Sequence, residues 1–214
     1  MNFERLYEYR FKDVNQADRR SVWKPISEYV YEQLDRPERI LDPAAGLGEF
    51  ISTVPSKERW GVDQVAYPPS AGMENVKMII SDVMEADLPA DYFDGVFISN
   101  LLEHLPDQNA VFAFLSKIRE TVRPGGLVAI MGPNIRYCAK DYWDMADHEV
   151  ALSHHAVEEH LYMAGFEPEK TVPRFLPYSF RSRLPANATL TAAYLRFKPA
   201  WSLLGKQFLV TGRK

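Results

Sequence analysis

The stretch "RILDPAAGLGEF", from Arg39 to Phe50, decides the fold of this chain. Its apolar run "RILD" is typical of a short buried strand and ends in an acid, Asp42. Small residues and two glycines follow, which indicates a tight turn into a segment compatible with a helix. A strand that runs into a glycine-rich turn is a common place for nucleotide-like ligands in α/β proteins. The residues around the turn therefore indicate which ligand it suits.

Two phosphate-binding patterns do not match this turn. A dinucleotide fingerprint needs a third glycine three residues after Gly48, where the chain has Ile51. A P-loop needs lysine and then serine or threonine, but Glu49 and Phe50 follow here, and Glu49 would repel a phosphate. The turn instead suits a ligand of little negative charge that approaches the backbone at Gly46 and Gly48 and offers a cation and a ribose diol to nearby acids. S-adenosylmethionine fits this description.

The rest of the chain alternates strands with helices. Apolar runs that end in polar residues occur at "RWGVD", "VKMIISD" and "YFDGVFISN", and "NAVFAFLSKIRETV" has helical spacing before a strand at "LVAIMG". A helix at "SHHAVEEHLYMAGF" and strands near "EPEKTVP" and "GKQFLVTGRK" follow. This alternation predicts an α/β fold, with a mostly parallel sheet covered by helices on both faces and ligands at the carboxyl ends of its strands. Asp42, Asp63 and Asp82 would all lie at that edge.

The sequence predicts a helix before the first strand and an irregular connection between the second and third strands. A helix is expected from about Ala17, because apolar residues make one face there: Val22, Trp23, Ile26, Tyr29 and Val30. Core packing explains that face. Between Gln64 and Val76, two prolines and a glycine predict an irregular connection instead of a helix.

Composition excludes several classes of protein. At 214 residues with 46% apolar content, the chain can bury a full core. A single cysteine, Cys138, excludes an intrachain disulfide and any CxxC pair, which fits a reducing cytoplasm. The start is unlike a signal peptide, and no window approaches 18 continuous apolar residues. The net charge of −4 is uneven: from Thr171 onward there are eight Lys or Arg and no acid, which leaves about −12 for the first 170 residues.

The opening stretch resembles motif I of class I S-adenosylmethionine-dependent methyltransferases, of a type 11-like kind, with Ala44 where the family often has its first glycine. The resemblance extends over Arg39 to Pro133 and implies a Rossmann-like sheet of seven strands, mostly parallel, whose last strand is antiparallel. It implies that Asp63 accepts hydrogen bonds from the ribose hydroxyls and that Asp82 and the Val83 amide contact the adenine. The residues expected to bind S-adenosylmethionine, and its product S-adenosylhomocysteine, are Arg10, Asp42, Ala44, Gly46, Gly48, Phe50, Asp63, Asp82, Val83 and Asn100.

A narrower similarity involves the flanks. The segments "YEYRF", "SNLLEHLP", "PNIRYC", "YWDMADH" and "LPYSFRSRLP" resemble bacterial methyltransferases found with polysaccharide and glycolipid biosynthesis. This implies one methyltransferase domain over 1–214, with an N-terminal helical cap (1–36), a cofactor-binding core (37–170) and final strands with a basic insert (171–214). It also implies that "YEYRF" folds over the cofactor, with Arg10 near the methionine carboxylate and Tyr9 or Phe11 against the adenosine.

The acceptor side of the site is expected after the fourth and fifth strands. His104, in "LLEHLPD", is a candidate general base for a hydroxyl acceptor, and the alternative is that it lines the cofactor pocket or caps the next helix. The loop "DYWDMADH" offers Tyr142 and Trp143 as a sugar-stacking wall, with Asp144 and His148 at the hydroxyls and His148 a second catalytic candidate. The alternative is a surface loop whose aromatic residues pack under the next helix. No metal is expected, because the histidines of "SHHAVEEH" suit a solvated helix surface.

Several functions stay open. The favoured function is methylation of a small molecule or glycan, by in-line transfer to an oxygen. The alternatives are a methyltransferase-like binding protein without turnover and an RNA methyltransferase. DNA is disfavoured, because an adenine-N6 enzyme would have Pro-Pro-Tyr or Pro-Pro-Phe after Asn100, where this chain has Leu101 and Leu102. The basic tail suits an anionic, lipid-linked acceptor or peripheral contact with a membrane, or it packs on the sheet and offsets the acidic body.

Overall fold

Seven strands form one mixed sheet in this computed structural model, which describes residues 5–6, 9, 16–67, 71–178 and 187–214. Neighbouring strands of the first five are parallel, and only β7 runs antiparallel to both of its neighbours. The strands, in their order across the sheet, are β3 (Val76–Ile80), β2 (Glu58–Asp63), β1 (Arg39–Asp42), β4 (Phe93–Ser99), β5 (Val122–Pro133), β7 (Gln207–Arg213) and β6 (Glu167–Val172). The Rossmann-like sheet expected from the sequence is confirmed.

The register places the strand-end acids together. Asp42 at the end of β1 lies opposite Gly61, and β2 continues only to Asp63. Asp63 in turn lies opposite Ile80 of β3. Carboxyl groups that are 21 residues apart in sequence therefore share one edge of the sheet, as expected for parallel strands.

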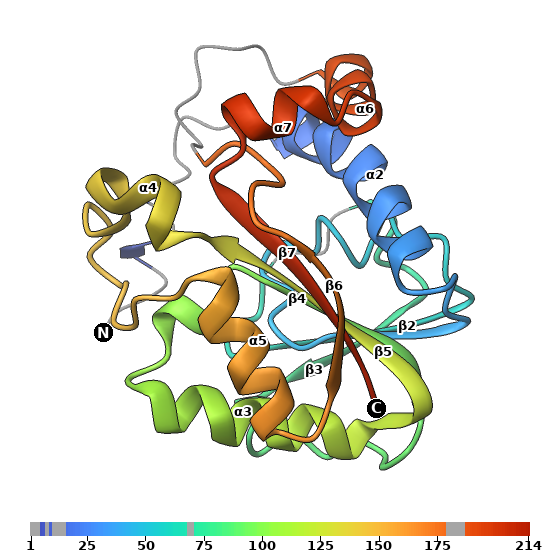
Figure 1. Ribbon diagram of the computed structural model, residues 1–214. Helices are drawn as coiled ribbons and strands as arrows, with labels where there is room; N and C mark the ends of the chain where they lie inside the picture. Colours follow the sequence, from blue (N-terminus) through green and yellow to red (C-terminus); the bar gives the residue numbers. More distant parts are fainter. Residues whose placement is uncertain (1–4, 7–8, 10–15, 68–70, 179–186) are drawn as a thin grey trace.

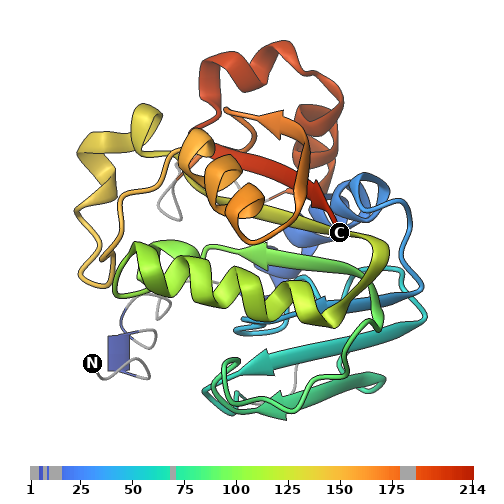
Figure 2. The same cartoon turned by 60° about the horizontal axis from the view of Figure 1, so that its bottom comes forward.

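Helices cover both faces of the sheet (Figures 1 and 2). On one face, α3 (Gln108–Thr121) and α5 (His154–Met163) bury apolar side chains against β4, β5 and β7. On the other face lie α2 (Gln16–Gln33), α6 (Ala188–Arg196) and α7 (Pro199–Leu204). The expected apolar face of α2 is confirmed, since Ile26 and Val30 are buried and the other three residues pack against them.

The connections after the first three strands contain no α-helix within the described residues. After β1, turns run from Gly46 to Val54, so a helix in this segment, compatible with the sequence pattern, does not form. Gly46 and Gly48 have φ angles of +53° and +77°, which cannot continue a right-handed helix. Pro55 follows soon after and leaves room for a single turn, closed by the bond from the Ser52 amide to the Gly48 carbonyl. The irregular link between β2 and β3 is confirmed for 64–67 and 71–75.

Two short helices follow β4 and β5 at the carboxyl edge of the sheet. A short 3-10 helix, η1 (Leu102–His104), follows β4, and α4 (Ile135–Tyr142) follows β5. The Glu103 carbonyl accepts bonds from the Glu149 and Val150 amides, at 2.8 and 3.2 Å. This pairing holds η1 against the loop that follows α4. Among the described residues, no helix is both long and apolar enough to cross a membrane.

Candidate active site

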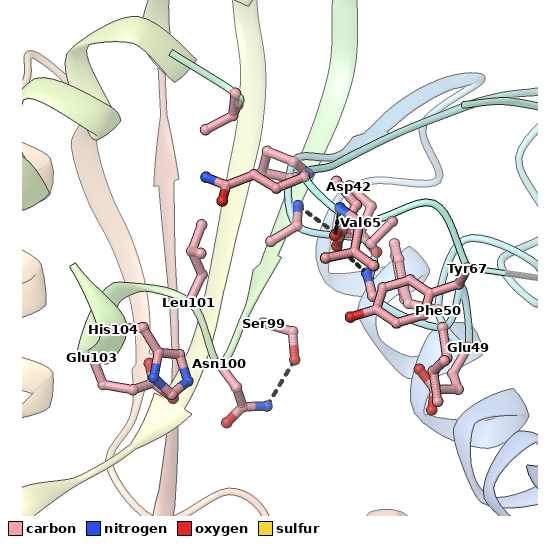
Figure 3. Close-up of a pocket in the computed structure, with 18 of the residues that line it drawn as sticks. Asp42, Glu49, Phe50, Val65, Tyr67, Ser99, Asn100, Leu101, Glu103 and His104 are labelled. Atoms are coloured by element: carbon pink, nitrogen blue, oxygen red, sulfur yellow. Dashed lines mark hydrogen bonds and ion pairs between the residues drawn. The ribbon is translucent and has the colours of Figure 1, made fainter. Parts of the chain in front are cut away.

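A cavity of about 300 Å³ opens at the carboxyl edge of the sheet, above β1, β2 and β4 (Figure 3). Residues from the motif I turn, the ends of β2 and β3, η1 and the loop after α4 line it. The sequence predicted nine of these lining residues: Asp42, Ala44, Gly46, Phe50, Asp63, Val83, Asn100, His104 and His148. The strand edge therefore brings seven of the ten cofactor candidates and both catalytic candidates into one space.

The Asp63 carboxylate organises the turn. Its Oδ2 accepts a bond of 2.7 Å from the Gly46 amide, and its Oδ1 accepts one of 2.9 Å from the Val65 amide. The bond to Gly46 joins the end of β2 to the motif I turn. Each carboxylate oxygen can accept a further bond, so Asp63 still has capacity for two hydroxyl donors.

The two glycines of the turn differ in what surrounds them. A side chain at Gly46 would meet no atom within 4 Å, so the backbone there faces open space in the cavity. A side chain at Gly48 would meet the Met73 sulfur at 2.6 Å, and Gly48 does not line the cavity. Gly48 thus permits close packing of the turn on Met73, which differs from the expected close approach of a ligand.

Asp42 is buried beneath the turn, with 3% of its surface exposed. The pKa of its carboxyl is raised to about 8, chiefly by burial and to a smaller extent by the nearby charges of Asp63 and Glu49, while a bond from the Ala44 amide acts in the opposite direction. A group with this pKa is largely protonated at neutral pH. Asp42 can therefore donate a hydrogen bond into the cavity as well as accept one.

An ion pair that the sequence prediction missed closes one side of the cavity. The Arg19 guanidinium, on α2, lies 2.7 Å from the Glu49 carboxylate of the motif I turn, and both side chains are largely buried. Burial lowers the pKa of Arg19, and the charge of Glu49 opposes that shift. The expected cation at this place was Arg10, which lies outside the described residues, as does Phe11. The alternative for the adenosine, Tyr9, is 65% exposed and does not line the cavity.

The adenine end of the site follows the expectation in part. Val83 lines the cavity, but Asp82 does not. The Asp82 carboxylate accepts bonds from the Met84 amide at 2.8 Å and from Gln64 Nε2 at 2.9 Å. Gln64 itself lines the cavity. Asp82 therefore braces Gln64, a residue that no motif in the sequence indicated.

Asn100 directly follows β4, the central strand of the sheet. Its φ angle is +48°, a conformation that few residues other than glycine adopt. The side-chain amide donates a bond of 3.0 Å to Ser99, and both residues line the cavity (Figure 3). Backbone of this kind is concentrated at functional sites.

The two histidines and two carboxylates meet at the far end of the cavity. His104 Nδ1 lies 2.8 Å from the backbone carbonyl of Asp147 and 3.4 Å from its carboxylate. The rings of His104 and His148 pack edge to face with their centroids 5.0 Å apart. Glu103, which the sequence analysis did not single out, is 3% exposed, and its carboxylate lies 3.9 Å from His104 Nε2. Glu103, His104 and His148 each have a potential metal-ligand atom within 4.8 Å of those of the other two, at a place where the sequence predicted no metal.

The predicted acceptor loop is partly wrong. Tyr142 is fully buried, and its hydroxyl donates to the Val150 carbonyl and accepts from the Leu152 amide. It therefore packs in the core, against the His148 ring, and cannot form a stacking wall. Trp143 and Asp144 are exposed and do not line the cavity. Met145 and Tyr178 line it instead.

The histidines of α5 also differ from the expectation of a solvated surface. His154 and His160 are buried, at 4% and 6% exposed, and burial lowers the pKa of both. His154 pairs with Asn134, and His160 pairs with Gln108 at 2.6 Å. Only His155 is exposed, beside Glu158. These histidines lie outside the cavity and support the packing of α5.

Comparison with known proteins agrees with the fold. Residues 16–176 match the methyltransferase domain family. The demethylmenaquinone methyltransferase of Staphylococcus aureus (strain JH9) is 25% identical over 143 residues, which cover 61% of this chain and 56% of that protein. The chain thus matches about half the length of this curated relative. The same enzyme from seven other strains of that species matches this chain with the same identity and coverage.

Solved structures show the same architecture. A methyltransferase from Archaeoglobus fulgidus aligns over 100% of both chains with a TM-score of 0.68 and 19% identity. The 1,6-didemethyltoxoflavin-N1-methyltransferase of Burkholderia thailandensis, solved with S-adenosylhomocysteine, aligns over 99% of this chain and 85% of its own, with a TM-score of 0.63 and 21% identity. Because the family match spans well over half of the chain, the protein belongs to the methyltransferase domain family, within the class I S-adenosylmethionine-dependent methyltransferases.

Proposed function

We propose that the protein transfers a methyl group from S-adenosylmethionine to a hydroxyl oxygen of a small molecule or glycan. One observation carries this proposal: a single cavity joins the Asp63 turn to His104 and His148. The ribose and the sulfonium of the cofactor lie some distance apart. The ribose would occupy the end of the cavity at Asp63, and the sulfonium methyl group would point toward His104 and His148. The related proteins named above act on demethylmenaquinone and 1,6-didemethyltoxoflavin, and small-molecule acceptors therefore suit the family.

The residues of the turn would hold the cofactor. We assign the ribose hydroxyls to the Asp63 carboxylate, which retains acceptor capacity beyond its two backbone bonds. The open backbone at Gly46 leaves space for close contact, and Gln64 and Val83 lie where the adenine would be expected. Arg19 lines the cavity and pairs with Glu49 of the turn, so we assign it, in place of Arg10, to the side of the site that holds the methionine carboxylate.

The chemistry needs little besides positioning. When bound, the cofactor supplies an electrophilic methyl group, and alignment of acceptor and methyl contributes an effective molarity on the order of 10⁵ M or more. A hydroxyl acceptor must also lose its proton. His104 Nδ1 faces the Asp147 carbonyl at 2.8 Å, so Nδ1 carries the hydrogen and Nε2 keeps its lone pair. That lone pair faces the far end of the cavity and would activate the hydroxyl.

Substitution of His104 tests this function. His104→Gln should lower kcat by about 10²- to 10⁴-fold, because general base catalysis contributes that much, while the affinity for S-adenosylmethionine stays within about threefold. Release of S-adenosylhomocysteine from a screen of hydroxyl-bearing acceptors gives kcat, and calorimetry gives the affinity. The matched control is His155→Gln, an exposed histidine on α5. Equal losses of turnover and affinity would place His104 in the cofactor wall instead.

Two alternatives predict different results. A binding protein without turnover would bind S-adenosylmethionine in calorimetry and release no S-adenosylhomocysteine with any acceptor. An RNA methyltransferase would methylate RNA in preference to small acceptors. The basic insert favours an anionic partner, but the described residues contain no recognisable RNA-binding module.

The insert between β6 and β7 would contact an anionic or lipid-linked acceptor, or an anionic membrane surface. Its helices expose large apolar side chains, with Phe197 63% and Leu203 77% exposed, next to Arg196 and Lys198. Arg and apolar residues together suit such a partner. Other basic residues of the segment serve the fold, since Lys206 pairs with Asp141 and Arg213 with Asp35 and Glu169. The single, buried thiol of Cys138 fits our proposal of a reducing, cytoplasmic location.

A further inference from the structure

We propose that Glu103, His104 and His148 bind a divalent transition-metal ion at the acceptor end of the cavity. One ligand atom from each residue lies within 4.8 Å of the others, and all three residues line the cavity. The inference rests on the proposed function, because it assigns the activation of the acceptor to this ion. Two histidines and one carboxylate are a ligand set that occurs in catalytic zinc sites, where the fourth position stays open for water or substrate.

The backbone around His104 prepares it as a ligand. Its Nδ1 is engaged by the Asp147 carbonyl at 2.8 Å, with the Asp147 carboxylate at 3.4 Å. Metal-binding histidines commonly donate their second ring N–H to a carbonyl or carboxylate, which orients the ring. The other nitrogen, Nε2, is then the ligand atom, and it is the one that faces Glu103 at 3.9 Å.

The three ligands are held from two separate segments. Glu103 and His104 lie on η1, and the Glu103 carbonyl accepts bonds from the Glu149 and Val150 amides just after His148. His148 packs against the buried Tyr142 ring with centroids 4.6 Å apart. Neither segment can move away without breaking these contacts. The arrangement is therefore fixed by the fold, unlike a chance meeting of exposed side chains.

The three side chains must rotate toward one another to bind an ion. With metal–ligand bonds of about 2.1 Å, two ligand atoms on one ion lie about 3 to 3.5 Å apart. The Glu103 Oε1 to His104 Nε2 distance is 3.9 Å, and all three ligand atoms lie within 4.8 Å of one another.

The ion would change how the acceptor loses its proton. The acceptor oxygen would occupy the open ligand position, and its hydroxyl proton would pass to solvent water, because a bound cation lowers the pKa of a coordinated hydroxyl. The oxygen then forms a bond to the methyl carbon while the carbon–sulfur bond breaks, with its electron pair left on sulfur. The products are a methyl ether and S-adenosylhomocysteine. With the ion bound, His104 Nε2 would bind the metal instead of accepting the proton directly, so the loss of turnover expected for His104→Gln would come from loss of a metal ligand.

Zinc titration of the full chain tests the site. After dialysis against a chelator and removal of the chelator, calorimetry with Zn²⁺ should show one tight site per chain. Glu103→Gln and His148→Phe should each weaken it by at least tenfold, and the phenyl ring retains the packing against Tyr142. His155→Gln removes the exposed His155–Glu158 pair on α5 and should leave the tight site unchanged. Loss of the tight site in His155→Gln, or its persistence in both cavity variants, would overturn the proposal.

A second measurement separates this proposal from the proposed function. The affinity of the metal-free protein for S-adenosylmethionine should equal that of the zinc-loaded protein within about threefold, while methyl transfer to a hydroxyl acceptor should need added Zn²⁺. Full methyl transfer by the metal-free protein would refute the metal and leave the methyltransferase function intact. Absence of S-adenosylmethionine binding in both forms would instead refute the proposed function. Should Glu103→Gln fail to fold, His148→Phe alone decides the zinc titration.

Discussion

The Asp63 carboxylate has two tasks in this site. It accepts bonds from the Gly46 and Val65 amides, which hold the turn closed, and we assign to it the ribose hydroxyls of the cofactor. Its neighbour Asp42 has a different environment, because burial raises its pKa to about 8. Asp42 is therefore largely protonated at neutral pH, whereas the half-buried Asp63 accepts both backbone bonds of the turn.

Replacement of Asp63 tests its role. Asp63→Ala should weaken S-adenosylmethionine binding by at least about 10-fold, because it removes two charge-assisted hydrogen bonds, each of which contributes about 1.5 to 3 kcal/mol at most. Calorimetry provides the dissociation constant, and thermal unfolding separates binding from loss of the two backbone bonds. Asp87→Ala, at an exposed position, is the control. A dissociation constant equal to that of the parent would remove the ribose assignment.

The contact between α2 and the motif I turn joins an N-terminal helix to the cofactor site. It consists of the Arg19–Glu49 ion pair, whose side chains are 14% and 10% exposed. A second contact joins the Thr53 hydroxyl of the turn to the Ser27 hydroxyl of α2 at 2.7 Å. Within the turn, the backbone at Gly48 packs closely on Met73. The turn that replaces a helix after β1 is therefore supported from α2.

Breaking this ion pair from either side should destabilise the protein, and the two losses should not be additive. Arg19→Met or Glu49→Gln alone should cost about 1 to 3 kcal/mol of unfolding free energy, because each leaves a mostly buried partner without its counter-charge. The double variant should cost less than the sum of the two. Urea unfolding of all four proteins gives this double-mutant cycle. Strict additivity would show that the two side chains are not coupled.

The α6 and α7 insert supports a different experiment. If it contacts anionic membranes, Phe197→Ser with Leu203→Ser should lower sedimentation with anionic vesicles about tenfold or more, because each exposed apolar side chain that enters the lipid boundary contributes on the order of 1 kcal/mol. Binding should also fall as salt is raised. Met163→Ser, 56% exposed on α5, is the matched control. No binding by the parent protein would make the insert structural, with Leu195 and Trp201 packing it on α2 and the sheet.

Opposite edges of the sheet carry acids with opposite responses to pH. At the carboxyl edge, Asp42 has its pKa raised to about 8 by burial. At the other edge, burial acts to raise the pKa of Asp94, but hydrogen bonds from Arg39 and Arg123 outweigh it and hold that pKa well below the ordinary range. The folded molecule therefore binds the Asp42 proton more tightly, and the Asp94 proton more weakly, than the unfolded chain does.

This pair predicts the pH dependence of stability. Because the folded pKa of Asp42 exceeds its unfolded value, its contribution is complete below about pH 4 and is lost as the pH rises to about 8. The contribution of Asp94 is present above about pH 4 and is lost as the pH falls further. Thermal unfolding of Asp42→Asn should show a smaller fall between pH 5 and 8 than the parent does.

Asp94→Asn provides the complementary measurement. It should lower Tm by about 2 to 6 °C at pH 7 and by less at pH 3, because at pH 3 the unfolded chain already binds a proton at Asp94 and part of the stabilising contribution is lost. Parallel curves for the parent and Asp42→Asn would show that Asp42 ionises normally. An equal effect of Asp94→Asn at both pH values would show that its charge does not matter to stability.

The sequence by itself determined the sheet and the position of the site. Short apolar runs separated by turns and helical segments predict the strands. Asp42 and Asp63 are the last residues of two of these runs, so their place at the strand ends does not depend on how the rest of the chain packs. Local dihedral preference explains the turn at Gly46 and Gly48 as well. Such features depend on neighbours within a few residues, which a sequence displays directly.

Only the tertiary structure decided which distant side chains meet. Arg19 reaches Glu49 because α2 packs beside the turn, and Glu103 with His104 reaches His148 because backbone bonds hold η1 against a loop more than 40 residues later. Tyr142 appeared to suit a sugar wall, but its burial depends on the path of that same loop. Burial and long-range contact arise from packing between segments that share no local pattern. The sequence alone therefore could not predict that Glu103, His104 and His148 meet at the far end of the cavity.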